Sequence, residues 1–318
     1  MNYYQILKIT GIILLIFSLF ILIPISAAFF YGESIDNFLQ SFLIIFFVGL
    51  VAYFPNKKER SQIKIREGFL IVAIFWFVLS FFGAIPFLMD ESLKFSLVDA
   101  VFESASGWTT TGATVISNID NLNKPLLLYR QLLQWLGGIG IVVLVLAILP
   151  ILGVGGMYLY KAETSSPVKD NKLSPRITET AKSLWGVYIV LTIACAVLYK
   201  IAGMSYFDAI GHSFSTVSIG GFSTHDASIG FYSSDLIKII CMVFMFLSAL
   251  NFVLHFLFYK NKSLTVYTSN SEMKSFLLII IILLLLVAIF STGGRIQSIE
   301  NIDVMFHILS FATTSGFT

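Results

Sequence analysis

Charged residues are scarce in this chain of 318 residues. Only 12% of the residues are charged and 57% are hydrophobic, whereas a soluble domain carries about 25% charged residues. This deficit, together with long apolar runs, predicts an integral membrane protein that resides in a lipid bilayer. The formal net charge of +2 is too small to indicate a nucleic-acid partner.

Cysteine and catalytic motifs are also rare or absent. Cys195 and Cys241 each lie in an apolar run without a Cys-x-x-Cys spacing or a histidine ligand pattern, so neither a disulfide framework nor a metal site is predicted. The sequence has no P-loop and no nucleophile–base pair, which argues against ATP-driven transport and against an enzyme. No predicted spanning segment carries an acid near its centre, which argues against a proton antiporter driven by carboxylates.

Long apolar runs are what the chain has in place of charge. A run of about 20 residues is long enough to span a bilayer as a helix. Seven such helices are predicted, at residues 9–30, 38–54, 69–89, 128–150, 183–203, 236–259 and 275–292. The fold class is therefore an all-α integral membrane protein.

Three shorter stretches, here called the signature segments, repeat within the chain at intervals of 109 and 95 residues. They are residues 99–114, 208–223 and 303–318, and they follow the third, fifth and seventh predicted helices. Laid over one another without a gap, they share an Asp at the first position, a Ser at the eighth and a Gly at the fourteenth. Repetition of this kind dictates architecture, and it predicts a repeated membrane unit.

Each signature segment reads as a short helix followed by a non-helical return. The Asp at its start is a plausible helix N-cap, and Ser, Thr and Gly follow about ten helix-compatible residues. Non-helical backbone survives at membrane depth only where it is buried in protein or lines a watery cavity. Each signature segment is therefore predicted to be a re-entrant pore loop, in units of the form helix–pore loop–helix, as in potassium channels.

The loop charges indicate which side each loop faces. One group of segments, residues 1–8, 55–67, 157–182 and 260–274, holds 14 Lys and Arg residues. The other group, residues 31–37, 90–103, 115–127, 204–235 and 293–303, holds three. The positive-inside rule then places the N-terminus in the cytoplasm and the signature segments on the outer side. The outer segments carry 12 acids, which either attract cations or simply remain where Lys and Arg are depleted.

The Ser/Thr and Gly runs suit a dehydrated cation. Such an ion needs oxygen ligands in place of water, and rings of backbone carbonyls supply them in potassium filters. Glycine lets the backbone leave regular geometry at little steric cost. The residues predicted to surround the ion are Thr110, Thr111, Gly112, Ala113, Ile219, Gly220, Gly221, Phe222, Thr314, Ser315, Gly316 and Phe317. A repeated structural turn that binds no ion is the alternative.

Other polar residues give weaker signals. His212 and His307 occupy the repeat position of Glu103, where local hydrogen bonding is favoured over a proton or metal role. Asn251 and His255, one turn apart, are expected to hydrogen-bond within the helix bundle. Arg130, near the start of the fourth helix, is expected to extend to the membrane interface.

The chain resembles the Trk/Ktr/HKT superfamily of potassium transporters, and within it the bacterial Trk-type membrane subunit. The resemblance covers nearly the whole chain and is carried by the three signature segments and by residues 133–140, 149–150, 153–156 and 173–182. It implies four non-identical units around one potassium pathway, with potassium as substrate and no covalent cofactor. It also implies a homodimer in the bacterial inner membrane and a cytosolic nucleotide-binding regulatory subunit.

The resemblance also implies a division of the chain. Residues 1–60 form a two-helix extension, 61–160 the first unit, 161–265 the second, and 266–318 a third unit that ends after its pore loop, with the fourth unit absent. We therefore expect that these 318 residues alone do not conduct, an expectation that rubidium uptake by cells expressing only this chain would contradict.

Three functions remain open from the sequence. The first is potassium uptake through a channel-like pore, down the electrochemical gradient. The second is a potassium symporter coupled to sodium or protons. The third is a truncated or scaffolding membrane protein that conducts no ions.

Overall fold

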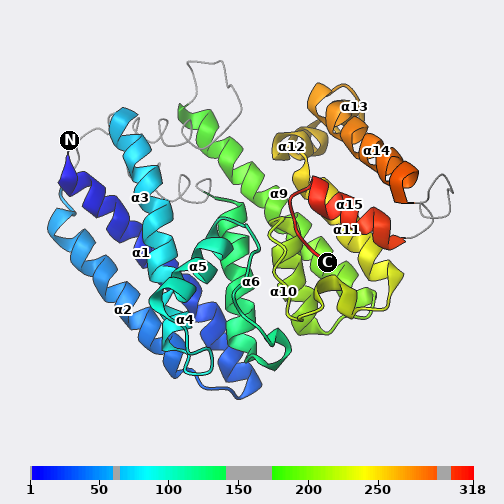
Figure 1. Ribbon diagram of the computed structural model, residues 1–318. Coiled ribbons are helices and arrows are strands. Elements are labelled where there is room, and N and C mark those ends of the chain that lie inside the picture. Colours follow the sequence, from blue (N-terminus) through cyan, green and yellow to red (C-terminus); the bar gives the residue numbers. More distant parts are fainter. Residues whose placement is uncertain (1, 60–64, 141–173, 292–301) are drawn as a thin grey trace. The chain divides into compact units, whose positions relative to one another are not determined.

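The regular structure is helical throughout the described parts of the chain. The computed structural model describes residues 2–59, 65–140, 174–291 and 302–318 (Figure 1). These residues form two compact bodies, body 1 with residues 1–109 and 113–185, and body 2 with residues 110–112 and 186–318.

Body 1 begins with two long helices that run side by side (Figure 1). They are α1 (Tyr3–Tyr31) and α2 (Asp36–Tyr53), and α2 ends in a 3-10 turn, η1 (Phe54–Asn56). Their close crossing depends on Gly11 and Gly49, because a Cβ at Gly11 would lie 2.8 Å from the Gly49 carbonyl oxygen. Small residues at such a crossing let two helix backbones approach.

The rest of body 1 includes residues 99–109, 113 and 114 of the first signature segment. Its elements are α3 (Ile65–Gly83), α4 (Ile85–Met89), α5 (Leu97–Trp108), the 3-10 turn η2 (Ile119–Asn121) and α6 (Lys124–Gly138). Helix α5 lies close to two glycines, since a Cβ at Gly83 would meet Trp108 Nε1 at 2.8 Å and a Cβ at Gly137 would collide with the Trp108 carbonyl. Gly137 therefore has the close-packing role expected of a small residue.

Polar contacts group the loops of body 1 at two ends. At one end, Asn2 donates to Glu59 and Glu67, at 3.0 and 2.8 Å. At the other end, the Lys124 amide donates to Glu33 at 3.0 Å, and Asn123 donates to Asp90 at 3.0 Å. These two groups agree with the sidedness that the loop charges predict for the same segments.

Body 2 contains the second and third signature segments. Its elements are α9 (Ser174–Ile201, which begins in body 1), α10 (Tyr206–Val217), the 3-10 turn η4 (Ser228–Phe231), α11 (Asp235–Ala249), α12 (Phe252–Asn261), α13 (Thr265–Thr268), α14 (Ser271–Ser291) and α15 (Ile302–Ala312). Helices α11 and α15 pack against each other.

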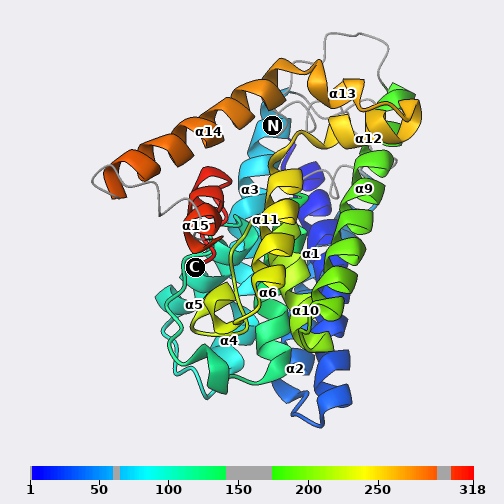
Figure 2. The same ribbon diagram turned by 90° about the vertical axis from the view of Figure 1, so that its right-hand side faces the viewer.

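The prediction of one continuous helix over residues 236–259 is wrong. The chain bends by 92° between α11 and α12 (Figure 2). Asn251 caps α12 by accepting from the Val253 amide at 3.1 Å, and the His255 ring lies 2.9 Å from the Leu247 carbonyl. These bonds satisfy backbone groups at the break. The hydrogen bonding within the helix bundle that was expected of both residues is also present, since Asn251 donates to Glu272 at 3.5 Å and Nδ1 of His255 lies 2.8 Å from the Tyr267 hydroxyl.

Four of the other predicted spanning helices are confirmed. In the described part of the chain, four helical segments are long and apolar enough to cross a membrane, or five if the bent pair counts as one span. Those four segments, Tyr3–Tyr31, Asp36–Asn56, Glu67–Met89 and Lys182–Ile201, confirm the first, second, third and fifth predicted helices. Residues 275–291 of the seventh fall within α14, and much of the fourth lies outside the described residues.

The predicted N-caps need correction. Asp99 is the third residue of α5, and Ser96 is the N-cap, with a reciprocal capping box between them. Ser205 caps α10 in the same way by accepting from the Asp208 amide at 3.0 Å. An Asp at the third position of a helix accepts a hydrogen bond from the N-cap residue, and its negative charge is attracted to the positive end of the helix dipole. Asp99 and Asp208 therefore stabilise the start of the helix from inside it.

Candidate functional site

Three short helices carry the signature segments. Helices α5, α10 and α15 have 12, 12 and 11 residues, which correspond to about 16–18 Å against a hydrocarbon core of about 30 Å. None of the three can span the membrane alone. At each C-terminus, the chain leaves the helix and enters the Ser/Thr and Gly run.

The same backbone turn ends all three helices. Thr109, Ser218 and Thr313 each donate their amide to the carbonyl four residues earlier, at 2.8, 3.1 and 2.9 Å. In the second and third segments, Gly220 and Ser315 then donate to the carbonyls of Ser215 and Ser310, at 2.8 and 2.9 Å. The repeat seen in the sequence is therefore a repeat of backbone conformation.

An alternation in the sign of φ marks the candidate ion-binding residues. Thr110, Ile219 and Thr314 have φ of 53°, 56° and 65°, and Gly112, Gly221 and Gly316 have φ of 76°, 78° and 76°, whereas the residue between each pair is not in the positive region. This alternation takes the backbone out of regular helical geometry, as a segment that supplies carbonyl ligands requires. A β-branched residue at positive φ is uncommon and costs about 1–3 kcal/mol.

Within body 2, the candidate segments touch one another through their glycines. A Cβ at Gly112 would collide with the Gly220 carbonyl oxygen, and a Cβ at Gly221 would collide with the Ser315 carbonyl oxygen. Residues 110–112, 219–221 and 315 thus lie in successive backbone contact. Ala113 belongs to body 1.

The two phenylalanines of the predicted set differ from their neighbours. Phe222 and Phe317 are buried, with 2% and 1% of their surface exposed. The Phe317 carbonyl accepts a hydrogen bond of 2.7 Å from the Ser310 hydroxyl. Their side chains therefore anchor the ends of the second and third candidate segments.

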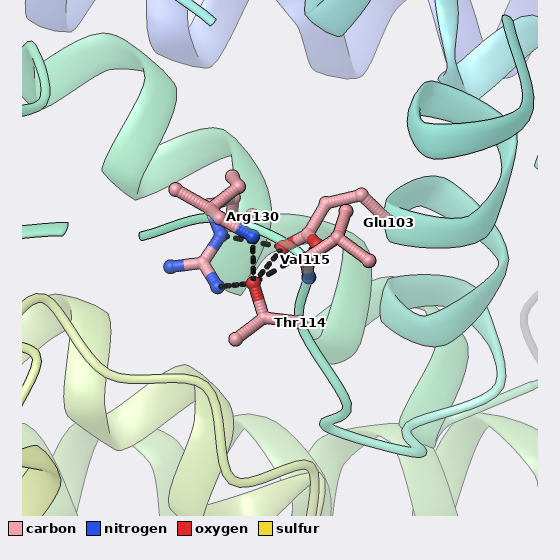
Figure 3. A network of polar contacts seen from close by, with 5 residues as sticks. Glu103, Thr114, Val115 and Arg130 are labelled. Atoms are coloured by element: carbon pink, nitrogen blue, oxygen red, sulfur yellow. Dashed lines mark hydrogen bonds and ion pairs between the residues drawn. The ribbon is translucent and has the colours of Figure 1, made fainter. Parts of the chain in front are cut away.

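The prediction that Arg130 extends to the interface is wrong. The Arg130 and Glu103 side chains are 1% and 0% exposed, and Nε of Arg130 lies 2.9 Å from Oε1 of Glu103. Figure 3 shows the two side chains meeting Thr114, whose hydroxyl lies 2.9 Å from both carboxylate oxygens and accepts from Arg130 Nη2 at 3.1 Å. The amide of Val115 donates to Glu103 as well, at 3.1 Å.

The local bonding expected of His212 is confirmed. Its Nδ1 lies 2.9 Å from the Asp208 carbonyl, and its Nε2 lies 2.9 Å from the Ser223 hydroxyl. Burial lowers the pKa of His212 to about 4, against the opposing effect of Asp208. His212 is therefore neutral at neutral pH.

Asp208 is charged beside this neutral ring. Partial burial alone would raise the pKa of Asp208, but hydrogen bonds from His225, Ser205 and Thr224 outweigh it and hold that pKa well below its ordinary value.

Among the residues that the structure describes, no group of three or more His, Cys, Asp or Glu side chains could hold a metal ion. Cys195 and Cys241 are buried free thiols.

The Glu103–Arg130 pair is the feature that sequence reasoning missed. No motif joins residues 27 positions apart, and an Arg near a helix end commonly reaches the interface. The available signal was the repeat itself, because Glu103 stands where the other two segments have histidines. An acid at that buried position requires a cationic or hydrogen-bonding partner.

Comparison with known proteins identifies the family. The family model described as "TrkH: Cation transport protein" matches residues 34–311. The chain belongs to this TrkH family. This match confirms the resemblance to the Trk branch. The chain is a multi-pass membrane protein of an ion-transport family and is not an enzyme.

TrkH relatives match along the whole chain. The chain is 46% identical over 322 residues to the Trk system potassium uptake protein TrkH of Escherichia coli (strain K12), and 47% identical over 323 residues to TrkH of Halomonas elongata, covering 100% of this chain and 67% of each relative. The crystal structure of the potassium transporter TrkH from Vibrio parahaemolyticus superposes with a TM-score of 0.83 at 41% identity, covering 100% of this chain and 66% of that one. The chain thus spans about two thirds of the length of these relatives.

Proposed function

We propose that this chain contributes to potassium uptake through a channel-like pore with a backbone-carbonyl selectivity filter. The observation that carries the proposal is the alternation of φ at three equivalent places, Thr110–Gly112, Ile219–Gly221 and Thr314–Gly316. The names of the TrkH relatives, which are potassium uptake proteins, support the choice of ion.

The fold has a corresponding interpretation. Residues 61–160, 161–265 and 266–318 supply helix–pore loop–helix units, the third only as far as its pore loop, and residues 1–60 add two further helices. Helices α5, α10 and α15 are pore helices. Each enters the membrane from its outer side, and the non-helical segment that follows returns to the same side. This interpretation is supported by their length, which is too short for a span, and by the non-helical backbone that follows each of them.

The chemistry of selection lies in the candidate filter segments. A potassium ion that loses its water needs oxygen ligands, and aligned carbonyls from residues 110–113, 219–222 and 314–317 provide them. The C-terminal ends of the three pore helices point into these segments, and their partial negative charge favours a cation there. The ion is the cargo of this site, and no covalent cofactor takes part.

The driving force is electrical. A membrane potential of 100 mV contributes about 2.3 kcal/mol per elementary charge, enough to accumulate potassium without ATP. A coupled symporter is the second candidate, and it predicts a reversal potential that moves with the sodium or proton gradient. Under the passive mechanism, only the potassium gradient moves it.

The resemblance to the Trk branch and the loop charges support a proposed assembly and location. The chain lies in the bacterial inner membrane with its N-terminus in the cytoplasm, as the loop charges predict. It pairs as a homodimer and works with a cytosolic nucleotide-binding regulatory subunit.

The test uses two glycines with similar positive φ. Gly221 has φ of 78° and Gly32 has φ of 71°, but only a Cβ at Gly221 meets another backbone, at Ser315. In the full-length gene product, we expect Gly221→Ala to lower rubidium uptake about tenfold or more, because small displacements at a positioned site have large effects on rate. Gly32→Ala, the matched control, should leave uptake near the wild-type level.

The protein amount in the membrane is measured for both variants. Uptake by Gly221→Ala equal to that by Gly32→Ala, at equal protein amounts, would remove residues 219–222 from the filter.

A further inference from the structure

One hydroxyl follows each of the first two filter glycines at the same distance along the chain. Thr114 lies two residues beyond Gly112, and Ser223 lies two residues beyond Gly221. Each hydroxyl oxygen accepts the amide two residues later, from Ile116 at 3.1 Å and from His225 at 3.0 Å. The two filter segments therefore end in the same hydroxyl-centred turn.

In the first segment, the Thr114 hydroxyl can donate its hydrogen to only one acceptor, the Glu103 carboxylate. The Thr114 oxygen accepts from the Ile116 amide and from Arg130 Nη2, both at 3.1 Å. A hydroxyl accepts at two lone pairs and donates one hydrogen, so the hydrogen of Thr114 must go to the Glu103 carboxylate 2.9 Å away. Glu103 also accepts the Val115 amide and thus holds two consecutive residues.

In the second segment, the neutral ring of His212 accepts the equivalent hydroxyl. Nδ1 of His212 faces the Asp208 carbonyl, which can only accept, so the ring proton lies on Nδ1. Nε2 is then the acceptor for the Ser223 hydroxyl at 2.9 Å. Glu103 and His212 occupy the same place in the repeat, five residues into each signature segment.

The third segment brings the same two positions together. His307 and Thr318, the equivalents of His212 and Ser223, line one cavity of about 290 Å³.

We propose that the residue at this position, Glu103 in the first segment and His212 in the second, is a positioning residue that fixes the outer end of the adjoining filter segment and thereby sets ion selectivity. Arg130 compensates the buried charge of Glu103. The inference rests on the proposed function, because it assigns a role within the same filter.

A fixed outer end matters because the filter backbone is strained. Thr110 and Ile219 are β-branched residues at positive φ, and such conformations persist only where the surroundings enforce them. A carbonyl site that distinguishes ions of equal charge depends on where its oxygens are held. Release of the hydroxyl lets the segment relax toward ordinary geometry, and the oxygens then adapt to sodium as readily as to potassium.

The cleanest variant removes one hydroxyl and leaves the buried charges paired. Thr114→Val keeps the shape of the side chain and retains the Glu103–Arg130 contact of 2.9 Å. Glu103→Gln instead leaves Arg130 buried without its counter-charge, which is strongly destabilising. The double variant Glu103→Leu with Arg130→Met removes both charges and also the acceptor of the Thr114 hydroxyl, whereas Thr114→Ser keeps the hydroxyl.

The matched control is Tyr129→Phe. The Tyr129 hydroxyl is buried on the same helix as Arg130 and donates to the Gly83 carbonyl at 2.8 Å. Its loss removes one buried hydrogen bond without touching a filter segment. A purely structural effect would therefore appear equally in Tyr129→Phe and in Thr114→Val.

The experiment measures rubidium and sodium uptake by cells that express the full-length gene product, normalised to protein in the membrane. Thr114→Val and the double variant should lower the rubidium-to-sodium ratio about tenfold, the effect of losing a hydrogen bond to a charged group. Thr114→Ser and Tyr129→Phe should keep the wild-type ratio. A wild-type ratio in Thr114→Val, with rubidium uptake intact, would overturn the positioning role and leave the proposed function standing. Absence of rubidium uptake in the wild type would refute the proposed function itself.

Discussion

A buried histidine distinguishes the second candidate filter segment from the first at the level of single residues. His212 is completely buried and is faced by Asp208, by the His225 ring at 6.4 Å and by the Tyr232 ring at 5.7 Å. Burial raises the pKa of Tyr232, so its hydroxyl stays neutral. Protonation of His212 would remove the acceptor that holds Ser223.

This arrangement predicts an acid-dependent loss of stability. An unfolded histidine has a pKa of about 6.5, whereas burial lowers the pKa of His212 to about 4. As the pH falls from 6.5 to 4, the unfolded state binds a proton that the folded state does not, so stability decreases by up to about 3 kcal/mol. Asp208, whose pKa is lowered mainly by hydrogen bonds that outweigh its burial, titrates below this window.

The measurement compares His212→Gln with the wild type. Glutamine stays neutral and can still accept from Ser223. Thermal unfolding of the purified protein at pH 7 and at pH 4.5 should show a larger loss in the wild type than in the variant. Equal losses would mean that His212 is not the group that titrates.

At the level of elements, small residues decide where helices can cross. A Cβ at Gly11 would lie 2.6 Å from the Tyr53 amide nitrogen in the α1–α2 pair, whereas a Cβ at Gly186, inside α9, would have nothing within 4 Å. Both glycines are helical, so the intrinsic preference of the helix for alanine is the same at both sites. Only the space beside the Cβ differs.

Substitution by alanine should therefore act with opposite signs. We expect Gly186→Ala to stabilise the protein by about 0.5–1 kcal/mol, because glycine loses more backbone entropy. We expect Gly11→Ala to destabilise it by about 1–3 kcal/mol, because the added methyl overpacks the crossing. Thermal unfolding in detergent measures both. Stabilisation by Gly11→Ala would contradict the close crossing of α1 and α2.

Hydropathy predicted most of the spanning helices because length and apolarity are properties of the sequence alone. It did not predict the 92° bend between α11 and α12. Residues 236–259 remain apolar through the break, and hydropathy does not register the local hydrogen bonds that Asn251 and His255 form there. The repeat predicted which residues form the candidate site. It did not predict the burial of Arg130, because the partner of a buried charge is chosen by the fold.

At the level of the whole molecule, the three signature segments share a backbone conformation but differ in the side chains that support it. The backbone hydrogen bond that ends each short helix and the alternation of φ recur in all three signature segments. The side chain that bonds to the end of each candidate filter segment changes from a carboxylate paired with Arg130 to a neutral imidazole. The repeat therefore extends to the backbone geometry of the signature segments but not to their supporting side chains.

The most direct test of the central claim is the reversal potential of the purified full-length gene product in lipid bilayers, with potassium on one side and sodium on the other. If the three signature segments form a potassium filter, the reversal potential will follow the potassium gradient and will not move when sodium or pH is changed. A reversal potential near zero under these conditions, which means equal permeation of the two ions, would contradict the account.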